Sequence, residues 1–67
     1  MNKYPVTIFW SDEDGCYVAV APDLKGCSAV GDTPEEALRE INTAVQLWLE
    51  TAKAENRVVP EPSRVAA

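Results

Sequence analysis

One long amphipathic helix is the feature that most constrains the fold of this chain. Residues 32–50 read "DTPEEALREINTAVQLWLE". Thr33, Pro34 and Glu36 supply an N-capping hydroxyl, a proline at the first helical position and an acid at the third, which is a strong helix-start pattern. Apolar residues then recur at helical spacing, among them Leu38, Ile41, Val45 and Trp48. The pattern predicts a packing helix and gives all seven residues a structural role.

Three strand-like segments precede the helix. Residues 4–10 ("YPVTIFW") and 16–21 ("CYVAVA") are rich in β-branched and aromatic residues and flank the polar turn "SDEDG". The turn "PDLKG" then leads into a short third strand at 27–31. After the helix, "RVV" at 57–59 is compatible with a short fourth strand. The sequence therefore predicts an α+β fold, a three-stranded antiparallel sheet packed by one helix, in the order β-β-β-α-β.

The two long strands are expected to present different faces. Closing them around residues 11–15 pairs Trp10 with Cys16, Ile8 with Val18 and Val6 with Val20, and predicts these six as the core face. The opposite face then holds Thr7, Phe9, Tyr17 and Ala19. A sheet covered on one side only normally has polar residues there, so Phe9 across from Tyr17 suggests a contact surface. The alternative is that Phe9 and Tyr17 simply pack against each other across the strands on a solvent-exposed face.

Size and charge limit the possible functions. The 67 residues form at most one domain, residues 1–67, with a frayed tail expected at 60–67. Such small domains commonly need a partner subunit, which predicts a homo-oligomer. A net charge of −5, from 11 acidic and 6 basic residues, disfavours direct nucleic-acid binding. It suits a basic partner, although solubility alone also explains it.

Cysteine usage and hydropathy point to an intracellular protein without a metal. Cys16 and Cys27, with no histidine in the chain, cannot complete a four-ligand zinc site. We expect buried free thiols because nothing indicates an oxidising compartment. The N-terminus has no long apolar run, so neither a signal peptide nor a membrane span is expected. The predicted location is the cytoplasm.

The order of these motifs resembles a known family. "YVAVAPDLKGCSAVGDTPEEAL" and the later "VPEP" are the most specific parts of a likeness that covers residues 4 to about 62. On these motifs the chain is similar to the N-terminal domain of HicB-family antitoxins. The resemblance implies a partial ribonuclease-H-like fold that binds and neutralises a small, basic, mRNA-cleaving HicA-like toxin. Many family members add a C-terminal DNA-binding domain. This chain stops at Ala67 without one, so we expect no operator binding.

The partner-binding residues predicted from the strands and turns are Phe9, Asp12, Glu13, Asp14, Tyr17 and Ala19. Ribonuclease-H chemistry needs several carboxylates converging on metal ions, one of them on the first strand, and residues 4–10 contain no acid. We therefore predict no enzymatic activity, no catalytic or metal site and no cofactor. The alternative to an antitoxin is an orphan homo-oligomeric module of the same fold with a different binding role.

Overall fold

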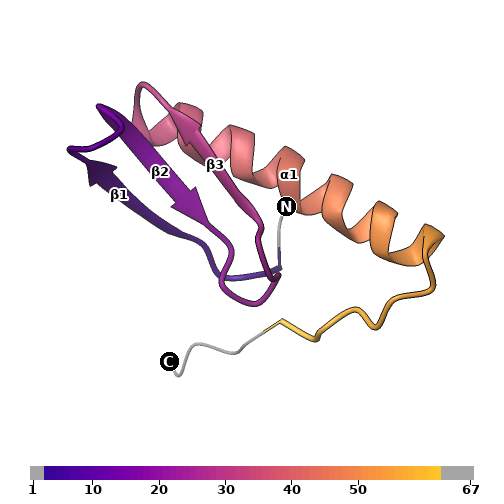
Figure 1. Cartoon of the computed structure of the whole chain (residues 1–67). Coiled ribbons are helices and arrows are strands. Elements are labelled where there is room, and N and C mark those ends of the chain that lie inside the picture. The colour runs from indigo at the N-terminus through magenta and orange to yellow at the C-terminus, as the bar shows by residue number, and fades with distance from the viewer. Residues whose placement is uncertain (1–2, 63–67) are drawn as a thin grey trace.

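A three-stranded antiparallel sheet carries one long helix on a single face (Figure 1). The computed structural model describes residues 3–62. The strands β1 (Thr7–Ser11), β2 (Cys16–Val20) and β3 (Ser28–Gly31) lie in the order β1-β2-β3, and α1 (Pro34–Ala54) packs mainly on β3 and β2. The predicted α+β class, the three strands and the long helix are confirmed.

The start of α1 has the predicted cap. The Thr33 hydroxyl accepts a hydrogen bond from the Glu36 backbone N–H at 3.1 Å, and Pro34 occupies the first turn. The Glu36 carboxylate accepts from the N–H of Asp32, at 3.0 Å, one residue before the cap. Backbone donors that an unaided helix start would leave unpaired are thereby satisfied, so α1 begins at a defined position above the end of β3.

The end of α1 sends the chain away from the sheet. Asn56 takes a left-handed conformation, with φ of 56°, and Arg57 N–H donates to Ala52 O at 2.8 Å. This arrangement is the Schellman motif, which closes a helix and turns the chain sharply.

The fourth strand predicted at 57–59 does not form. After the turn at the end of α1, the tail instead passes the N-terminal segment, where the Tyr4 hydroxyl donates to Pro60 O at 2.6 Å. Of the tail predicted to fray, residues 60–62 are placed here and residues 63–67 lie outside the described residues.

Most of the predicted packing residues of α1 face the sheet. Ile41 and Val45 are buried, and the half-buried Trp48 donates from Nε1 to Lys25 O at 3.1 Å, which ties the helix to the turn between β2 and β3. Leu38 is 45% exposed, so its predicted place in the core is wrong.

The predicted register of β1 and β2 is wrong by one residue. Phe9 pairs with Val18, and Ser11 pairs with Cys16, so the connecting loop has four residues instead of five. Gly15 closes the loop with φ of 64° and donates its N–H to Ser11 O at 2.9 Å. Left-handed φ favours glycine, and this glycine makes the shorter loop possible.

A one-residue slip exchanges the two faces of one strand relative to the other. β1 keeps the predicted faces, with Ile8 toward the helix and Phe9 away from it. β2 is reversed: Tyr17 and Ala19 face α1, whereas Val18 lies beside Phe9 on the other face.

Small residues make up most of the core. Ala19, Ala21 and Ala37 are fully buried, and at Gly31 a β-carbon would lie 2.5 Å from the backbone N of Ala37. The helix start therefore rests directly on the end of β3, where only glycine fits. Both cysteines are free, as predicted. Cys27 is buried, and burial raises the pKa of its thiol, whereas Cys16 is half-buried.

Candidate protein-interaction surfaces

The sheet face opposite α1 carries a row of large apolar side chains. Phe9, Val18 and Val30 lie side by side across the three strands. Phe9 is 46% and Val30 54% exposed, and Val18 between them is half-buried. By strand alternation the remaining residues of this uncovered face are Thr7, Ser11, Cys16, Val20 and Ser28. None of these eight residues carries a charge.

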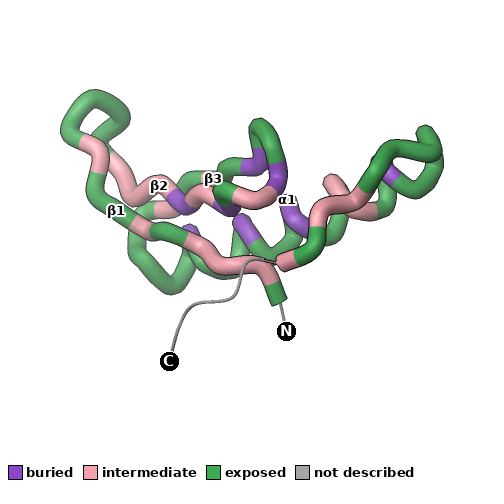
Figure 2. Tube along the Cα trace, turned by 90° about the horizontal axis from the view of Figure 1, so that it is seen from below, coloured by how far each residue is buried: buried purple, intermediate pink, exposed green. Residues whose placement is uncertain are grey.

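Acidic residues gather at one end of the sheet. The antiparallel order brings the β1–β2 turn and the β3–α1 turn to the same end. Figure 2 shows the β1–β2 turn exposed along its length. We call this region the acidic end, and its six acids are Asp12, Glu13, Asp14, Asp32, Glu35 and Glu36. None of them forms an ion pair within residues 3–62. Their negative charge is therefore available to a partner.

A half-exposed tryptophan lies beside one of these acids, Asp12. Trp10 is 50% exposed, and its ring meets Tyr17 edge to face with centroids 5.1 Å apart. Its Nε1 donates to Asp12 Oδ1 at 2.8 Å, which holds the carboxylate beside the indole. A half-exposed aromatic ring with a fixed charged neighbour is the kind of side chain that anchors protein interfaces.

Local hydrogen bonds also order the acidic turn. The Ser11 hydroxyl donates to Asp14 Oδ2 at 3.0 Å and accepts from the Asp14 backbone N–H at 3.3 Å. Serine and aspartate commonly stabilise turns in this way. The carboxylates at the turn are thus presented in a defined orientation and need little further ordering on binding.

The structure separates the residues that were predicted to bind a partner together. Phe9 lies on the uncovered face, while Asp12, Glu13 and Asp14 are exposed at the acidic end. Placing Tyr17 and Ala19 beside Phe9 was wrong. Ala19 is 0% exposed beneath the helix, and Tyr17 packs partly against the core and Trp10. In their places the uncovered face presents Val18 and Val30, which reasoning from the sequence missed.

A signal for the correct arrangement exists in the turn. In "SDEDG" the first serine can close the turn through its own side chain, as Ser11 does here with Asp14. Such a serine belongs at the strand end and leaves a four-residue loop. If the loop is taken to begin at Asp12 and not at Ser11, the predicted register pairs Val18 with Phe9, as the structure does.

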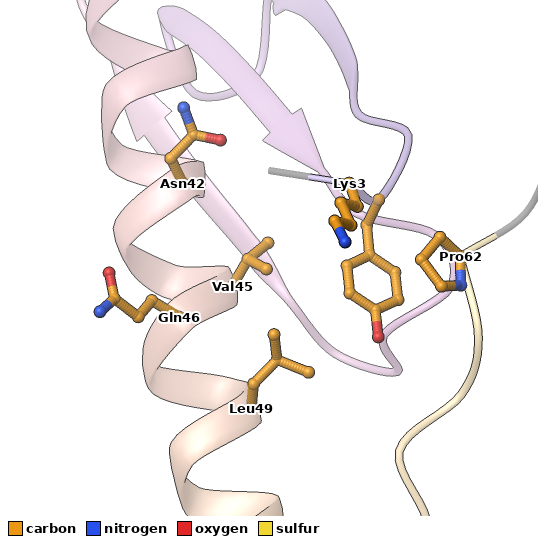
Figure 3. Close-up of a pocket in the computed structure, with 7 residues that line it drawn as sticks. Lys3, Asn42, Val45, Gln46, Leu49 and Pro62 are labelled. Atoms are coloured by element: carbon orange, nitrogen blue, oxygen red, sulfur yellow. The ribbon is translucent and has the colours of Figure 1, made fainter. Parts of the chain in front are cut away.

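A groove lies between α1 and the N-terminal segment (Figure 3). It has a volume of about 510 Å³ and an apolar floor formed by Val45 and Leu49. Figure 3 shows these two side chains directed into the groove, whereas the amide of Gln46 points away. Small-molecule sites usually have a few polar groups that converge on the ligand. The groove lacks that convergence among its described lining residues, which does not favour a small ligand.

Within residues 3–62 no cluster of three or more histidine, cysteine, aspartate or glutamate side chains is arranged to hold a metal ion. In the same part of the chain, no helix is long and apolar enough to cross a membrane. The surfaces that stand out are therefore the uncovered face and the acidic end, and both are suited to contact with other macromolecules.

Comparison with curated proteins finds several relatives of similar length. A UPF0150 protein of Synechocystis sp. is 46% identical over 58 residues, which cover 87% of this chain and 78% of the relative. A UPF0150 protein of Thermoplasma acidophilum is 43% identical over 58 residues, covering 87% and 83% of the two chains. No solved structure matches the chain at a significant level.

The family comparison is the informative one for function. The model described as "HicB_like antitoxin of bacterial toxin-antitoxin system" matches residues 4–67. The match spans all three strands, the helix and the tail, and it agrees with the resemblance drawn from the sequence motifs. This chain belongs to the HicB-like antitoxin family of bacterial toxin–antitoxin systems.

Proposed function

We propose that this chain is an antitoxin that binds and neutralises a small, basic, mRNA-cleaving HicA-like toxin. Its family supports a toxin–antitoxin role. The observation that carries the choice of partner is the acidic end, where six carboxylates without internal ion pairs lie at the same end of the sheet as the half-exposed Trp10. A basic protein complements that surface in charge, and the indole supplies apolar contact area.

Charge and apolar contact would have separate effects on binding. Complementary charges raise the rate of encounter, and salt screens that effect. Desolvated aromatic side chains mainly set how long a complex lasts. In this proposal the six acids guide the toxin to the acidic end, and Trp10 then anchors it. Neutralisation follows because the bound antitoxin prevents mRNA from reaching the toxin.

The remaining predictions about function accompany this proposal. We infer a non-catalytic protein that acts by binding, without direct contact with nucleic acid. A homo-oligomeric state and a cytoplasmic location stay predictions. The first experiment is co-expression with the product of the adjacent gene. Relief of that product's toxicity supports the proposal, whereas a non-toxic neighbour that does not bind would favour the orphan module.

Binding kinetics can test the acidic end directly. The triple variant Asp12→Asn, Glu13→Gln and Asp14→Asn retains side-chain hydrogen-bond acceptors but removes three charges. We expect association with the toxin to slow about tenfold at low salt, and its dependence on salt to weaken. The matched control, Glu50→Gln, Glu55→Gln and Glu61→Gln, changes net charge equally elsewhere. Equal slowing by both triples would show that net charge alone acts, and would remove the acidic end from the mechanism.

The anchor role of Trp10 has its own test. Trp10→Ala should speed dissociation by about 10- to 100-fold, since hot-spot residues contribute about 2 kcal/mol or more. Leu47→Ala is the control, because Leu47 is also well exposed, at 58%, but lies on the flank of α1 that faces away from β1. A Trp10→Ala chain that folds and dissociates at the wild-type rate contradicts this assignment.

A further inference from the structure

The outer side of β1 is an edge of the sheet that the rest of the described chain leaves open. The strand order places β1 outermost, and α1 packs mainly on β3 and β2 (Figure 1). Among residues 3–62, β2 is the one strand that pairs with β1. We call the side of Thr7–Ser11 that faces away from β2 the open edge.

The usual protections of an edge strand are absent from β1. Natural proteins guard such an edge with a charge, a proline, a bulge or a covering segment, because its unpaired N–H and C=O groups can pair with another chain. The strand "TIFWS" has no charge and no proline, and its register with β2 runs without a bulge. The other edge strand, β3, is shorter and is the strand that α1 contacts most. The open edge is therefore where an added strand fits best.

The backbone groups that face the open edge can be assigned. In an antiparallel pair, successive residues of a strand direct their N–H and C=O groups alternately toward the neighbour and away from it. Ser11 O accepts from Gly15 N–H within the β1–β2 turn, so Ser11 faces the β2 side. By alternation Phe9 also faces β2, whereas Ile8 and Trp10 face outward. Each of these two outward residues offers one donor and one acceptor to an added strand.

We propose that an extended segment of the basic toxin adds to the sheet as a new strand along the open edge. The inference rests on the proposed function and gives its binding site a backbone component. In strand addition, main-chain hydrogen bonds supply affinity and the flanking side chains supply specificity. Trp10 joins the two parts of the site, because its backbone belongs to the open edge and its side chain is the proposed anchor at the acidic end.

Charge selects the toxin as the occupant. β1 ends at Ser11, directly before the three acids of the turn, Asp12, Glu13 and Asp14. A strand added to β1 therefore has one end beside these carboxylates, where lysine or arginine side chains complement them. A second copy would instead bring its own net charge of −5 to this edge. Next to Phe9, on the uncovered face, the added strand is expected to carry an apolar side chain.

Hydrogen exchange of single backbone amides, followed by NMR, tests the open edge in the whole chain. In the free chain the amides of Ile8 and Trp10 should exchange at least about tenfold faster than that of Phe9, which faces β2. Saturation with the product of the adjacent gene should slow both at least about a hundredfold. The amide of Val58, which is 91% exposed in the tail, is the control and should not change.

Two exchange results would overturn strand addition. One is fast exchange of the Ile8 and Trp10 amides in the saturated complex. The other is slow exchange of both in the free chain, since the edge would then already be covered, by a second copy if the protection increases with protein concentration.

A change confined to the backbone separates hydrogen bonding from side-chain contact. Synthetic residues 1–15 can be ligated to residues 16–67 at the Gly15–Cys16 junction, which leaves the sequence intact. A methyl group on the Ile8 amide nitrogen removes one outward donor, obstructs the open edge and keeps every side chain. We expect it to weaken binding of the adjacent gene product at least about tenfold. The same methyl group on the Val58 amide is the matched control and should leave binding unchanged.

The outcomes distinguish this inference from the proposed function. Circular dichroism verifies that the methylated chains fold, and the exchange measurement decides if the Ile8-methylated chain does not. A folded Ile8-methylated chain that binds as tightly as the wild type overturns strand addition and leaves the antitoxin role standing. A wild type that neither binds nor neutralises the adjacent gene product overturns the proposed function, and this inference with it.

Discussion

Both faces of the sheet carry bulky apolar side chains, and they differ in the small residues that lie beneath the helix. The face beneath α1 presents Ile8 and Tyr17 beside the small residues Ala19, Ala29 and Gly31, while the uncovered face presents Phe9, Val18 and Val30. A one-sided sheet normally directs its bulky apolar residues to the core and polar residues to water. Small residues allow the helix to approach the strands closely. Phe9 and Val30 on the other face are left about half exposed.

This distribution leaves the covered face with a modest core. Leu24 and Ile41 are the largest fully buried side chains in the described chain, and alanines make up much of the rest. A domain of this size buries a smaller fraction of its surface than a larger one. The stability of one copy therefore depends on few side chains, and substitutions on the two faces should have unequal consequences.

The largest expected effect is at the centre of the covered face. Ile41→Ala should lower the free energy of unfolding by about 2–5 kcal/mol, because it removes buried methyl groups and leaves a cavity. Leu47→Ala, at an exposed position on the same helix, should change it by about 0.5 kcal/mol or less. Thermal unfolding followed by circular dichroism measures both. Equal melting temperatures for the two variants would contradict the packing of α1 on the sheet.

A pair of substitutions on β2 separates the two faces more sharply. Ala19→Val adds two methyl groups where the helix lies closest, and overpacking should destabilise the chain by about 1–3 kcal/mol. Val18→Ala, one residue away on the uncovered face, should have the smaller effect at low concentration, where copies are apart. Denaturant titrations at low protein concentration compare the two. A larger loss from Val18→Ala would restore the register that the sequence first indicated.

The helix could be predicted from sequence, whereas the register of β2 could not. α1 alternates polar and apolar residues with one clear period, and Thr33, Pro34 and Glu36 mark its start. "CYVAVA" is apolar on both faces, so its pattern does not say whether Tyr17 and Ala19 or Val18 and Val20 face the helix. The choice depends on a single residue in the loop, which Ser11 and Gly15 determine through local hydrogen bonding and backbone conformation.

Of the two candidate surfaces, the sequence predicted the positions of the turn acids and of Phe9, but not those of Val18, Val30 and Trp10. Turn acids such as Asp12 and Asp14 are exposed in almost any register, so their surface position could be predicted from sequence. The exposure of Trp10 and Leu38 depends on how α1 and the sheet pack together, which is a property of tertiary structure. Val30 was missed because the short third strand offered too few residues to assign its faces.

A smaller effect is expected where α1 begins on the covered face. Thr33→Ala should lower the free energy of unfolding by about 1 kcal/mol, since the Glu36 N–H loses its side-chain acceptor. Thr43 provides a matched control within the same helix, where it is exposed and its hydroxyl donates to Arg39 O at 3.3 Å. Thr43→Ala should be neutral or slightly stabilising, because alanine has the higher helix propensity. Comparable losses from both variants would argue against the cap.

The two cysteines report on the two faces without any substitution, and here we expect no change in stability. Cys27 is buried, and burial raises the pKa of its thiol, so less of it is the reactive thiolate at neutral pH. Cys16 lies half-buried on the uncovered face. Alkylation monitored by mass spectrometry should therefore modify Cys16 first, and modification of Cys27 should accelerate as the pH is raised toward its elevated pKa. If the predicted homo-oligomer forms through the uncovered face, Cys16 should also react more slowly as the protein concentration increases, while Cys27 should not respond to concentration. Faster modification of Cys27 at neutral pH would contradict the assignment of the covered face, and a Cys16 rate independent of concentration would count against an oligomer that uses the uncovered face.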